Sequence, residues 1–298
     1  MASLPTHAIV ADIGGTNARF SRVDLASLQL DKVAVYPCAE FATLADALVH
    51  YQQQQSVETI KHVAIAIACP VTGDNVSMTN FHWQFSVKAM QQQLGLDALS
   101  VINDFTAVAM CLPALTPEQK IKLGAGEAHS DKPMAVLGAG TGLGVAHLVP
   151  FQGKYIPLPG EGGHVDWAAQ TEQEWFIQRY LAAHFGHVSP ERLLSGPGIE
   201  SLYLALAAYQ QLDVPAKTAA EIGQQALDGS CALSQAVVAQ FFASLGSLAG
   251  DLALTLSTFG GVYVAGGITP KLLPLLEQSE FRSRFEAKGR FAAFNRQI

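Results

Sequence analysis

The chain has 298 residues, of which 49% are hydrophobic and only 14% charged, and its formal net charge is −7. This length can bury one large core or two medium ones, and we expect two domains. A surface with few cations and a net negative charge attracts neither a nucleic-acid backbone nor an anionic membrane, so we predict neither partner.

The start of the chain and its cysteines favour a soluble, cytoplasmic protein. Residues 1–7 lack the basic start and the apolar core of a signal peptide. The longest wholly apolar stretch, 63–71, is far shorter than the ~20 residues that span a bilayer. The four cysteines form no C-x-x-C pair and no zinc-binding pattern, so we expect buried, reduced thiols.

The first predicted elements are two strands, 7–11 and 18–24, joined by the glycine turn 12–17. These glycines connect strand to strand, whereas a dinucleotide fingerprint or a Walker loop opens a helix, and neither motif occurs in the chain. We therefore predict a hairpin whose backbone amides bind phosphate. Asp12 heads the turn and would repel phosphate unless a magnesium ion, held through water, lies between them. The alternative is an Asp that only bonds its own turn amides.

Asp104 is the most informative carboxylate of the first half. The pattern predicts a helix over 41–55, a buried strand over 63–68, a helix from the N-cap Ser86 to 94, and a strand over 99–102 that runs directly into Asn103-Asp104. Ligands of open α/β sheets collect at the carboxyl ends of strands, where Asp104 could accept a proton from a substrate hydroxyl and Asn103 could bind sugar oxygens. The equally weighted alternative is an Asp N-cap of the next helix.

The second half repeats the opening theme. Predicted strands over 134–137 and 145–149 flank the turn 138–144, in which Gly140-Thr141 repeats Gly15-Thr16. This internal similarity indicates two related α/β halves, each of which opens with a glycine-turned hairpin. The composition of the turn fits a second phosphate-binding element.

Helices dominate the remaining elements. Capping boxes are predicted at Thr171/Glu174 and at Thr218/Glu221, and Ser189-Pro190 has the chemistry of a helix start. Residues 233–257 suit a long buried helix with small residues where another element crosses closely. A strand over 262–265 follows, and Gly266-Gly267 stops it at an edge that faces a ligand.

The glycine-rich segment 159–164 carries an acid and a histidine, Glu161 and His164. We favour a loop whose backbone approaches a small polar ligand over a flexible surface turn. A metal site is disfavoured, because no further ligand stands at useful spacing. Taken alone, Glu191 is typical of an acid in the first turn of a helix.

Together these motifs resemble those of the bacterial ATP-dependent glucokinases of the proteobacterial type, within the hexokinase, actin and heat-shock ATPase superfamily. The resemblance runs from residue 8 to about residue 291. The set and its order are specific, although any single glycine motif would not be. The matching segments are 11–19, 67–74, 78–80, 102–108, 138–148, 158–166, 194–198 and 259–268.

The resemblance implies a fold and a set of site residues. The fold is α/β, a two-domain actin-like (ribonuclease H-like) ATPase fold with a cleft between a small domain, 1–107, and a large domain, 108–298. Asp104 is the implied base for the glucose 6-hydroxyl, and Asn103, Glu161, His164 and Glu191 are the implied sugar ligands. The implied ATP- and phosphate-binding residues are Ala11, Asp12, Ile13, Gly14, Gly15, Thr16, Asn17, Gly140, Thr141, Gly142, Gly266 and Gly267.

The resemblance also implies an activity and partners. The activity is ATP-dependent phosphorylation of D-glucose to glucose 6-phosphate, the first step of glycolysis, with Mg²⁺ near Asp12 and a homodimer as the assembly. Relatives usually continue past residue 298 by one strand and one helix, so this return segment is expected to be missing. Two alternatives stay open: a kinase for another hexose or amino sugar, and a shortened sugar- or nucleotide-binding protein with little turnover. A repressor is the weakest alternative, since no separate DNA-binding segment occurs.

Overall fold

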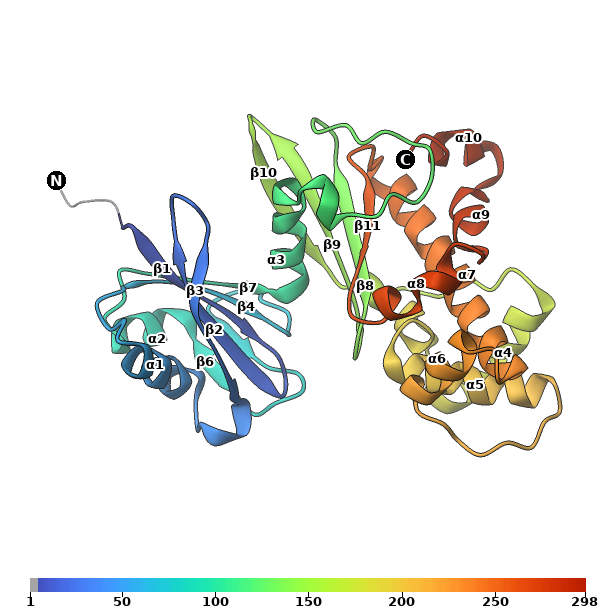
Figure 1. The fold of residues 1–298 in the computed structure, drawn as a ribbon, viewed down its shortest axis with the longest axis horizontal. Helices are drawn as coiled ribbons and strands as arrows, with labels where there is room; N and C mark the ends of the chain where they lie inside the picture. Colours follow the sequence, from blue (N-terminus) through green and yellow to red (C-terminus); the bar gives the residue numbers. More distant parts are fainter. Residues whose placement is uncertain (1–4) are drawn as a thin grey trace. The chain divides into compact units, whose positions relative to one another are not determined.

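The computed structural model describes residues 5–298, and the chain divides into two compact units, Met1–Ala107 and Val108–Ile298. Each unit has its own mixed sheet and its own hydrophobic core. Figure 1 shows the elements of both. Residues up to Ala107 are called the first unit, and residues from Val108 onward are called the second unit.

The first unit is built on a five-stranded sheet in the order β3-β2-β1-β4-β7. The first three strands form an antiparallel meander, and β4 and β7 run parallel to β1. Helices α1 and α2 complete its core (Figure 1). The elements are β1 (His7–Ile13), β2 (Asn17–Asp24), β3 (Leu30–Pro37), a 3-10 turn (Cys38–Glu40), α1 (Leu44–Gln55), β4 (His62–Ile67), a small pair β5 (Asn75–Ser77) and β6 (Gln84–Ser86), α2 (Val87–Gln93) and β7 (Ala98–Asn103). Helix α3 (Asp104–Cys111) begins in the first unit and ends in the second.

Local capping chemistry sets the helix starts of the first unit. The Ser86 hydroxyl accepts a hydrogen bond from the Ala89 amide at 3.0 Å, which confirms its predicted N-cap role. The first helix begins at Leu44 rather than at the predicted residue 41, because Thr43 and Asp46 form a capping box there. With Thr43 as its N-cap, α1 therefore begins three residues later than hydrophobic spacing alone indicates.

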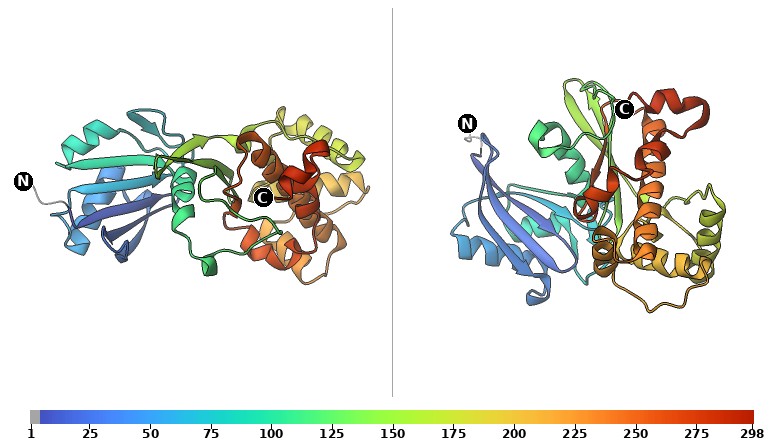
Figure 2. Two further views of the ribbon diagram at one scale, coloured as in Figure 1. Left: turned by 90° about the horizontal axis from the view of Figure 1, so that it is seen from above. Right: turned by 45° about the vertical axis from the view of Figure 1, so that its right-hand side comes forward.

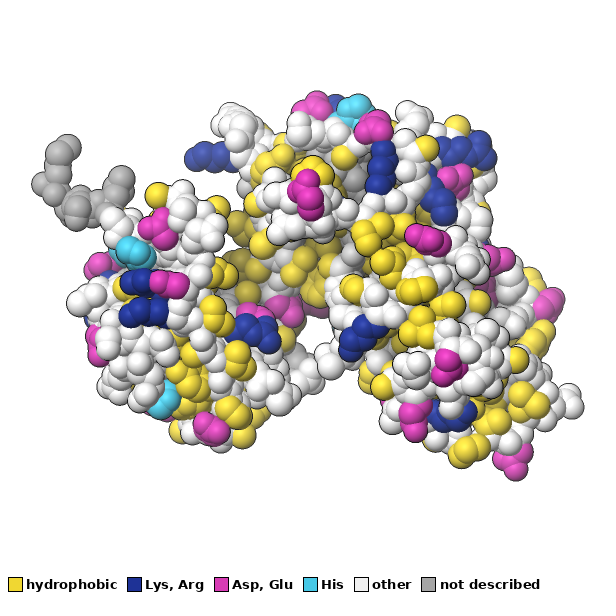
Figure 3. Space-filling view, in the orientation of Figure 1, with side chains coloured by type: hydrophobic (Ala, Val, Ile, Leu, Met, Phe, Trp, Pro, Cys, Tyr) yellow, Lys and Arg dark blue, Asp and Glu magenta, His cyan; other side chains and the backbone are white. Residues whose placement is uncertain are grey.

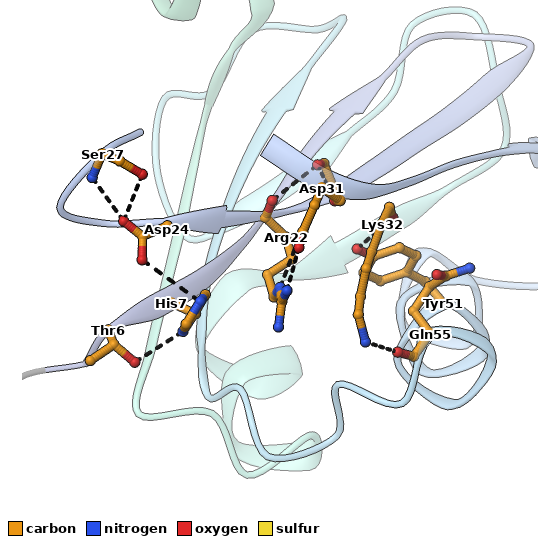
Figure 4. A network of polar contacts seen from close by, with 10 residues as sticks. Thr6, His7, Arg22, Asp24, Ser27, Asp31, Lys32, Tyr51 and Gln55 are labelled. Atoms are coloured by element: carbon orange, nitrogen blue, oxygen red, sulfur yellow. Dashed lines mark hydrogen bonds and ion pairs between the residues drawn. The ribbon is translucent and has the colours of Figure 1, made fainter. Parts of the chain in front are cut away.

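A polar network fastens the edge strand β3 to its neighbours (Figure 4). Arg22 on β2 pairs with Asp31 on β3, next to an irregularity in the strand register. Lys32 has a left-handed backbone with a φ of 50°, and its carbonyl oxygen accepts a 3.0 Å bond from the Tyr51 hydroxyl of α1. The Lys32 ammonium also donates to the Gln55 carbonyl at the end of α1, where a cation is favourable.

The second unit contains a four-stranded sheet in the order β10-β9-β8-β11 and most of the helices. Figure 2 shows α7 running alongside this sheet, consistent with its contacts to β8 and β11. The elements are β8 (Met134–Ala139), β9 (Leu143–Phe151), β10 (Lys154–Gly160), α4 (Glu172–Phe185), α5 (Gly196–Tyr209), α6 (Ala219–Leu227), α7 (Ala232–Leu256), β11 (Val262–Ala265), α8 (Leu273–Leu276), α9 (Phe281–Glu286) and α10 (Ala292–Asn295), with 3-10 turns at Leu112–Ala114, Pro117–Gln119, Gly162–His164, Pro190–Arg192, Thr269–Leu272 and Gly289–Phe291.

The four-stranded sheet of the second unit repeats the order of four strands in the first unit, whose sheet has β7 in addition. Each sheet begins with an antiparallel hairpin across a glycine turn, β1-β2 or β8-β9, continues into a third antiparallel strand, and adds a parallel strand beside the first. The repeat predicted from Gly15-Thr16 and Gly140-Thr141 is therefore confirmed at the level of the backbone. In both sheets the glycine turn lies at the carboxyl end of the first strand, the position where α/β folds bind ligands.

The predicted long helix with a close crossing is also confirmed. An ideal Cβ on Gly246 would lie 2.2 Å from the Phe281 carbonyl oxygen, and one on Gly250 would lie 2.4 Å from the Phe285 carbonyl oxygen. These two glycines let α9 approach the backbone of α7. By length and composition α7 could cross a membrane, but it is mostly buried inside the second unit and so serves as a core helix.

Replacing Gly246 by Ala is expected to destabilise the second unit by about 1–3 kcal/mol, because the methyl group would clash with a backbone carbonyl that cannot turn away. Gly223→Ala in α6 is the matched control. There the added Cβ meets only a Leu272 methyl at 3.3 Å, so the higher helix propensity of Ala should offset the contact. Urea unfolding of both variants measures the difference, and equal stabilities would contradict the close-crossing argument.

One predicted helix start, at Ser189-Pro190, and one predicted capping box, at Thr171/Glu174, differ from the structure. Ser189-Pro190 opens only a short 3-10 turn without a side-chain cap, and the α-helix begins later, with Ser195 as N-cap of α5. Thr171 does cap α4, but the Glu174 carboxylate bonds the Gln170 amide instead of closing the box. A buried partner, Arg284, draws this carboxylate inward.

Charges of both signs are interspersed on the surface. On the face drawn in Figure 3, acidic and basic side chains alternate within each unit instead of gathering by sign. Near the C-terminus, for example, Arg296 and Arg282 both contact Glu286. On that face no patch of one sign offers a surface to a nucleic-acid backbone or an anionic membrane.

Candidate active site

The first glycine turn joins β1 to β2 and is held from one side by Cys38. The Gly14 amide donates to the Asn17 carbonyl at 3.0 Å, which closes the turn. The buried Cys38 donates its amide to the Thr16 carbonyl at 2.8 Å, and its thiol lies 3.4 Å from the Gly14 carbonyl. Burial raises the pKa of this thiol, so it stays protonated. Cys38 is thus a structural support of the turn. The prediction of buried thiols also holds for Cys69, but it is wrong for Cys111, which is exposed, and for Cys231, which is partly exposed.

Asp12 and Arg19 face each other across this hairpin. They are register partners in β1 and β2, and Arg19 donates to the Asp12 carboxylate at 2.6 Å. Both side chains are 55% exposed. Arg19 is not among the site residues expected from the sequence, although the antiparallel register of the predicted hairpin places it opposite Asp12. Arg19 supplies a positive charge beside the turn.

The residues around Asp12 fit an ion bound mainly through phosphate. Within residues 5–298 no cluster of three or more His, Cys, Asp or Glu side chains could hold a metal. Mg²⁺ commonly uses one or two carboxylates, several waters and substrate phosphates instead of a full protein cage. A single exposed carboxylate at the head of a glycine turn matches that donor set.

Asp104 lies where β7 ends and α3 begins, and it is half-buried. Its Oδ1 accepts hydrogen bonds from the Phe105 amide at 2.8 Å and from the Asn103 side-chain amide at 2.9 Å. Burial raises the pKa of this carboxyl above its usual value and the negative charge of Asp12 adds to the effect, while these hydrogen bonds partly oppose it. A carboxyl with a raised pKa is better suited to accept a proton than a fully solvated Asp.

Asn103, not Asp104, caps the following helix. The Asn103 Oδ1 accepts a bond from the Thr106 amide at 3.1 Å, the i to i+3 geometry of an N-cap. Its Nδ2 donates to the Cys69 carbonyl at 3.3 Å as well as to Asp104. The N-cap of this helix is therefore Asn103, and the N-cap alternative for Asp104 is wrong. The second carboxylate oxygen of Asp104, Oδ2, is left for a ligand. To bind a sugar hydroxyl as well, the Asn103 side chain would have to share the hydrogen bonds that it makes with Thr106, Cys69 and Asp104.

The second glycine turn is bonded to the start of α5. The Gly140 amide donates to the Gly142 carbonyl, and the Gly196 amide donates to the Gly140 carbonyl, both at 2.8 Å. Gly266 has a φ of +85° and approaches this turn closely, since a Cβ there would lie 2.4 Å from the Ala139 carbonyl oxygen. The predicted adenosine-side glycines and the second phosphate turn are thus neighbours within one unit.

The predicted sugar residues of the second unit gather around Leu143. The 3-10 turn Gly162–His164 is closed by a 2.9 Å bond from the His164 amide to the Glu161 carbonyl. His164 Nε2 lies 3.8 Å from Glu191 Oε2, and the same Glu191 oxygen accepts a 2.9 Å bond from the Leu143 amide. Glu191, which the sequence alone indicates as an acid in the first turn of a helix, lies in the first turn of a 3-10 segment, and its carboxylate also lies beside the glycine turn.

The structure therefore brings the candidate residues into two groups, one in each unit. The first unit holds residues 11–17 with Asn103 and Asp104. The second unit holds residues 140–142, the segment 161–164, Glu191 and the pair 266–267. Each group contains one glycine turn and at least one carboxylate, so each can offer backbone amides and an acid to a ligand of its own unit.

Comparisons with known proteins give the family of the chain. The family model described as Glucokinase matches residues 9–298. The glucokinase of Photorhabdus laumondii is 46% identical over 292 residues, which covers 98% of this chain and 91% of the relative. A crystal structure of glucokinase from an Antarctic psychrotroph has a TM-score of 0.88 at 38% identity and covers 99% of this chain and 93% of that one. A glucokinase from Balamuthia mandrillaris, solved in complex with glucose, has a TM-score of 0.80 at 20% identity over 98% of this chain and 88% of that one.

Two sheets share a four-strand order that begins with a hairpin, and each has a glycine turn at the carboxyl end of its first strand. They define an α/β protein of the two-domain actin-like ATPase fold. Matches over nearly the whole chain narrow this class further. The chain belongs to the glucokinase family.

Proposed function

We propose that this protein transfers the γ-phosphoryl group of ATP to the 6-hydroxyl of D-glucose and releases ADP and glucose 6-phosphate. The observation that carries the proposal is Asp104, a half-buried carboxyl with a raised pKa at the carboxyl end of a parallel strand, in a chain of the glucokinase family. The two glycine turns supply the backbone amides that an acidic protein needs to bind a polyphosphate.

In the proposed reaction Asp104 acts as general base. Its carboxylate accepts the proton of the glucose 6-hydroxyl as the sugar oxygen bonds to the γ-phosphorus, and the bond from that phosphorus to the bridging oxygen of ADP breaks. Positioning and charge stabilisation do most of the work in such in-line transfers. The amides of residues 14–17 and 140–142 hold the phosphates, and Arg19 adds a positive charge beside the first turn. When Mg²⁺ is bound, it neutralises charge on the phosphates, with Asp12 as its nearest proposed protein contact through water.

The proposed sugar ligands are polar groups that can take several hydroxyls. Glu161, His164 and Glu191 come from the second unit and Asn103 from the first. Carboxylates accept hydrogen bonds from hydroxyls, whereas the histidine and the asparagine can donate or accept. These groups do not by themselves select one epimer, so a kinase for another hexose or an amino sugar is the second candidate.

A hexose panel with Mg-ATP and coupled detection of ADP tests the proposal. We expect glucose to be turned over with the highest kcat/KM of the panel. Faster turnover of another hexose or of an amino sugar would favour the second candidate. Thermal stabilisation by glucose without any product would instead indicate a binding protein and would refute the enzyme.

Three further expectations concern the setting of the reaction. We propose that Mg²⁺ is the metal, that the protein works in the cytoplasm, and that it forms a homodimer. Removal of Mg²⁺ by a chelator should abolish turnover and readdition should restore it. Light scattering in solution measures the assembly, and a monomeric mass at working concentration would contradict the dimer.

The pH profile of kcat/KM should report Asp104. A base must be unprotonated, so activity is expected to fall as the pH drops through the raised pKa of this group. Asp12→Asn removes a negative charge that helps raise this pKa, so the acid limb should move to lower pH, whatever the loss in maximal rate. Asp24→Asn, at the opposite end of the β1-β2 hairpin, is the control and should leave the limb in place. If the acid limb of the kcat/KM profile of Asp12→Asn stays at the same pH, the coupling between the Asp12 and Asp104 carboxyls is refuted.

A further inference from the structure

The peptide unit of Leu143 is held by both the predicted sugar residues and the second glycine turn. Its amide donates to Glu191 Oε2 at 2.9 Å. Its carbonyl oxygen lies so close to Gly163 that a Cβ on that glycine would be 2.2 Å away. The Leu143 side chain is buried in the core of the second unit. Leu143 is also the first residue of β9 after the turn, so the turn cannot shift without moving these contacts.

Glu191 lies directly against the turn. An ideal Cβ on Gly142 would be 2.6 Å from Glu191 Oε2, so only a glycine leaves room for the carboxylate. The backbone around Glu191 is fixed as well, because the Ser195 hydroxyl donates to the Glu191 carbonyl at 2.8 Å. The same segment holds the far side of the turn through the 2.8 Å bond from Gly196 to Gly140.

The carboxylate of Glu191 has capacity left for a ligand. A hydrogen bond from an amide to an ionised carboxylate is stronger than a neutral one, so the bond from Leu143 orients Oε2 firmly. A carboxylate offers about four acceptor positions over its two oxygens. The side chain is 27% exposed and His164 lies 3.8 Å away, so a polar ligand can reach it.

We propose that Glu191 is a positioning residue for the second phosphate turn as well as a sugar ligand, so that sugar binding and nucleotide binding are coupled through its bond to the Leu143 amide. This inference rests on the proposed function. A sugar hydroxyl bound to Glu191 fixes the rotamer that holds Leu143, and this rotamer in turn fixes the turn 140–142. By thermodynamic reciprocity, glucose then raises the affinity for nucleotide by the same factor as nucleotide raises the affinity for glucose.

The test compares dissociation constants for the Mg²⁺ complex of AMPPNP, a non-hydrolysable ATP analogue, with and without saturating glucose. In the unaltered protein we expect glucose to tighten nucleotide binding about fivefold or more. Gly142→Ala pushes the Glu191 carboxylate away and should bring this ratio close to one. Gly196→Ala is the matched control, because its Cβ would meet only the Gly140 oxygen at an ordinary 3.7 Å, and it should keep the full ratio.

Hydrogen exchange at the Leu143 amide gives a second readout that needs no nucleotide. Glucose alone should slow this exchange in the unaltered protein, and at saturating glucose the Glu191→Gln variant, whose neutral side chain bonds the amide more weakly, should show a smaller effect. If Gly142→Ala binds no nucleotide, this hydrogen-exchange measurement alone tests the proposed role of Glu191.

A full glucose effect on nucleotide binding in Gly142→Ala, or exchange at Leu143 that ignores glucose, would overturn the coupling while turnover of glucose by the unaltered protein continued. Failure of the proposed function is a separate result, namely no turnover of glucose by the unaltered protein.

Discussion

Replacing Asp104 by Asn is expected to lower kcat for glucose phosphorylation by about 10²–10⁴-fold, the usual contribution of a general base. The substitution keeps the shape of the side chain, and its Oδ1 can still accept the 2.8 Å bond from the Phe105 amide. What it removes is the ability to take a proton. KM for glucose should change much less than kcat, since the sugar ligands stay in place.

The same substitution should not lower thermal stability at neutral pH. The folded-state pKa of Asp104 is raised, so this group stabilises the fold at low pH and loses that contribution as the pH rises through the folded pKa. At neutral pH the buried charge is therefore a net cost of folding, which a neutral Asn does not carry. We expect Tm to stay equal or rise, the pattern of a residue kept for activity and not for stability.

Asp74→Asn is the control, and its expected effects on Tm and kcat are the reverse of those of Asp104→Asn. The Asp74 carboxylate accepts bonds from the Ser86 hydroxyl at 2.6 Å and the Lys88 amide at 2.9 Å, and these bonds lower its pKa. Its contribution to stability is present above the unfolded-state pKa and is lost as the pH falls through the folded-state pKa. Asp74→Asn should therefore lower Tm at neutral pH and leave kcat nearly unchanged. A large drop of Tm in Asp104→Asn, or an Asp104→Asn enzyme with full kcat, would contradict the assigned role.

The sequence predicts well those features that depend on a few consecutive residues. The strand 262–265, the Ser86 cap and the capping box at Thr218 and Glu221 all agree with the structure, because each follows from local spacing or capping chemistry. The two glycine hairpins belong to the same group, since turn chemistry and alternation are read within about twenty residues. The repeat of the two halves follows from the similarity of these hairpins.

Features that depend on distant residues could not be predicted in this way. Glu191 bonds Leu143, which lies 48 positions earlier in the chain, and Glu174 bonds Arg284, which lies 110 positions later. Helix-start chemistry at each glutamate is a valid local interpretation, and in both cases a tertiary partner overrides it. For Glu191 the family resemblance supplied a functional role, whereas nothing in the sequence indicated its contact with the glycine turn.

Arg284 and Glu174 form a buried ion pair at the junction of α4, α7 and α9. Arg284 Nη1 lies 3.0 Å from Glu174 Oε1, and the two side chains are only 12% and 1% exposed. Gln240 donates to the same carboxylate at 2.8 Å, and Arg284 Nε donates to the Ser247 hydroxyl at 3.0 Å. Burial pushes the pKa of Glu174 upward, but the bonds from Arg284 and Gln240 outweigh burial and hold this pKa below its usual value. Folding therefore depends on this carboxylate being ionised and paired.

Arg284→Met should destabilise the second unit by about 3–5 kcal/mol, because it leaves a buried carboxylate without its counter-charge. Adding Glu174→Gln removes that charge and should restore most of the loss. The loss should be smaller at acidic pH for two reasons. In Arg284→Met the unpaired Glu174 can be protonated in the folded state, which removes the buried charge. In the unaltered protein the ion pair loses its contribution to stability as the pH falls through the lowered pKa of Glu174. Arg296→Met, which removes a 65% exposed partner of Glu286, is the control and should cost no more than about 1 kcal/mol. Urea unfolding across pH measures all four proteins, and a double variant no more stable than Arg284→Met would show that packing, and not the stranded charge, causes the loss.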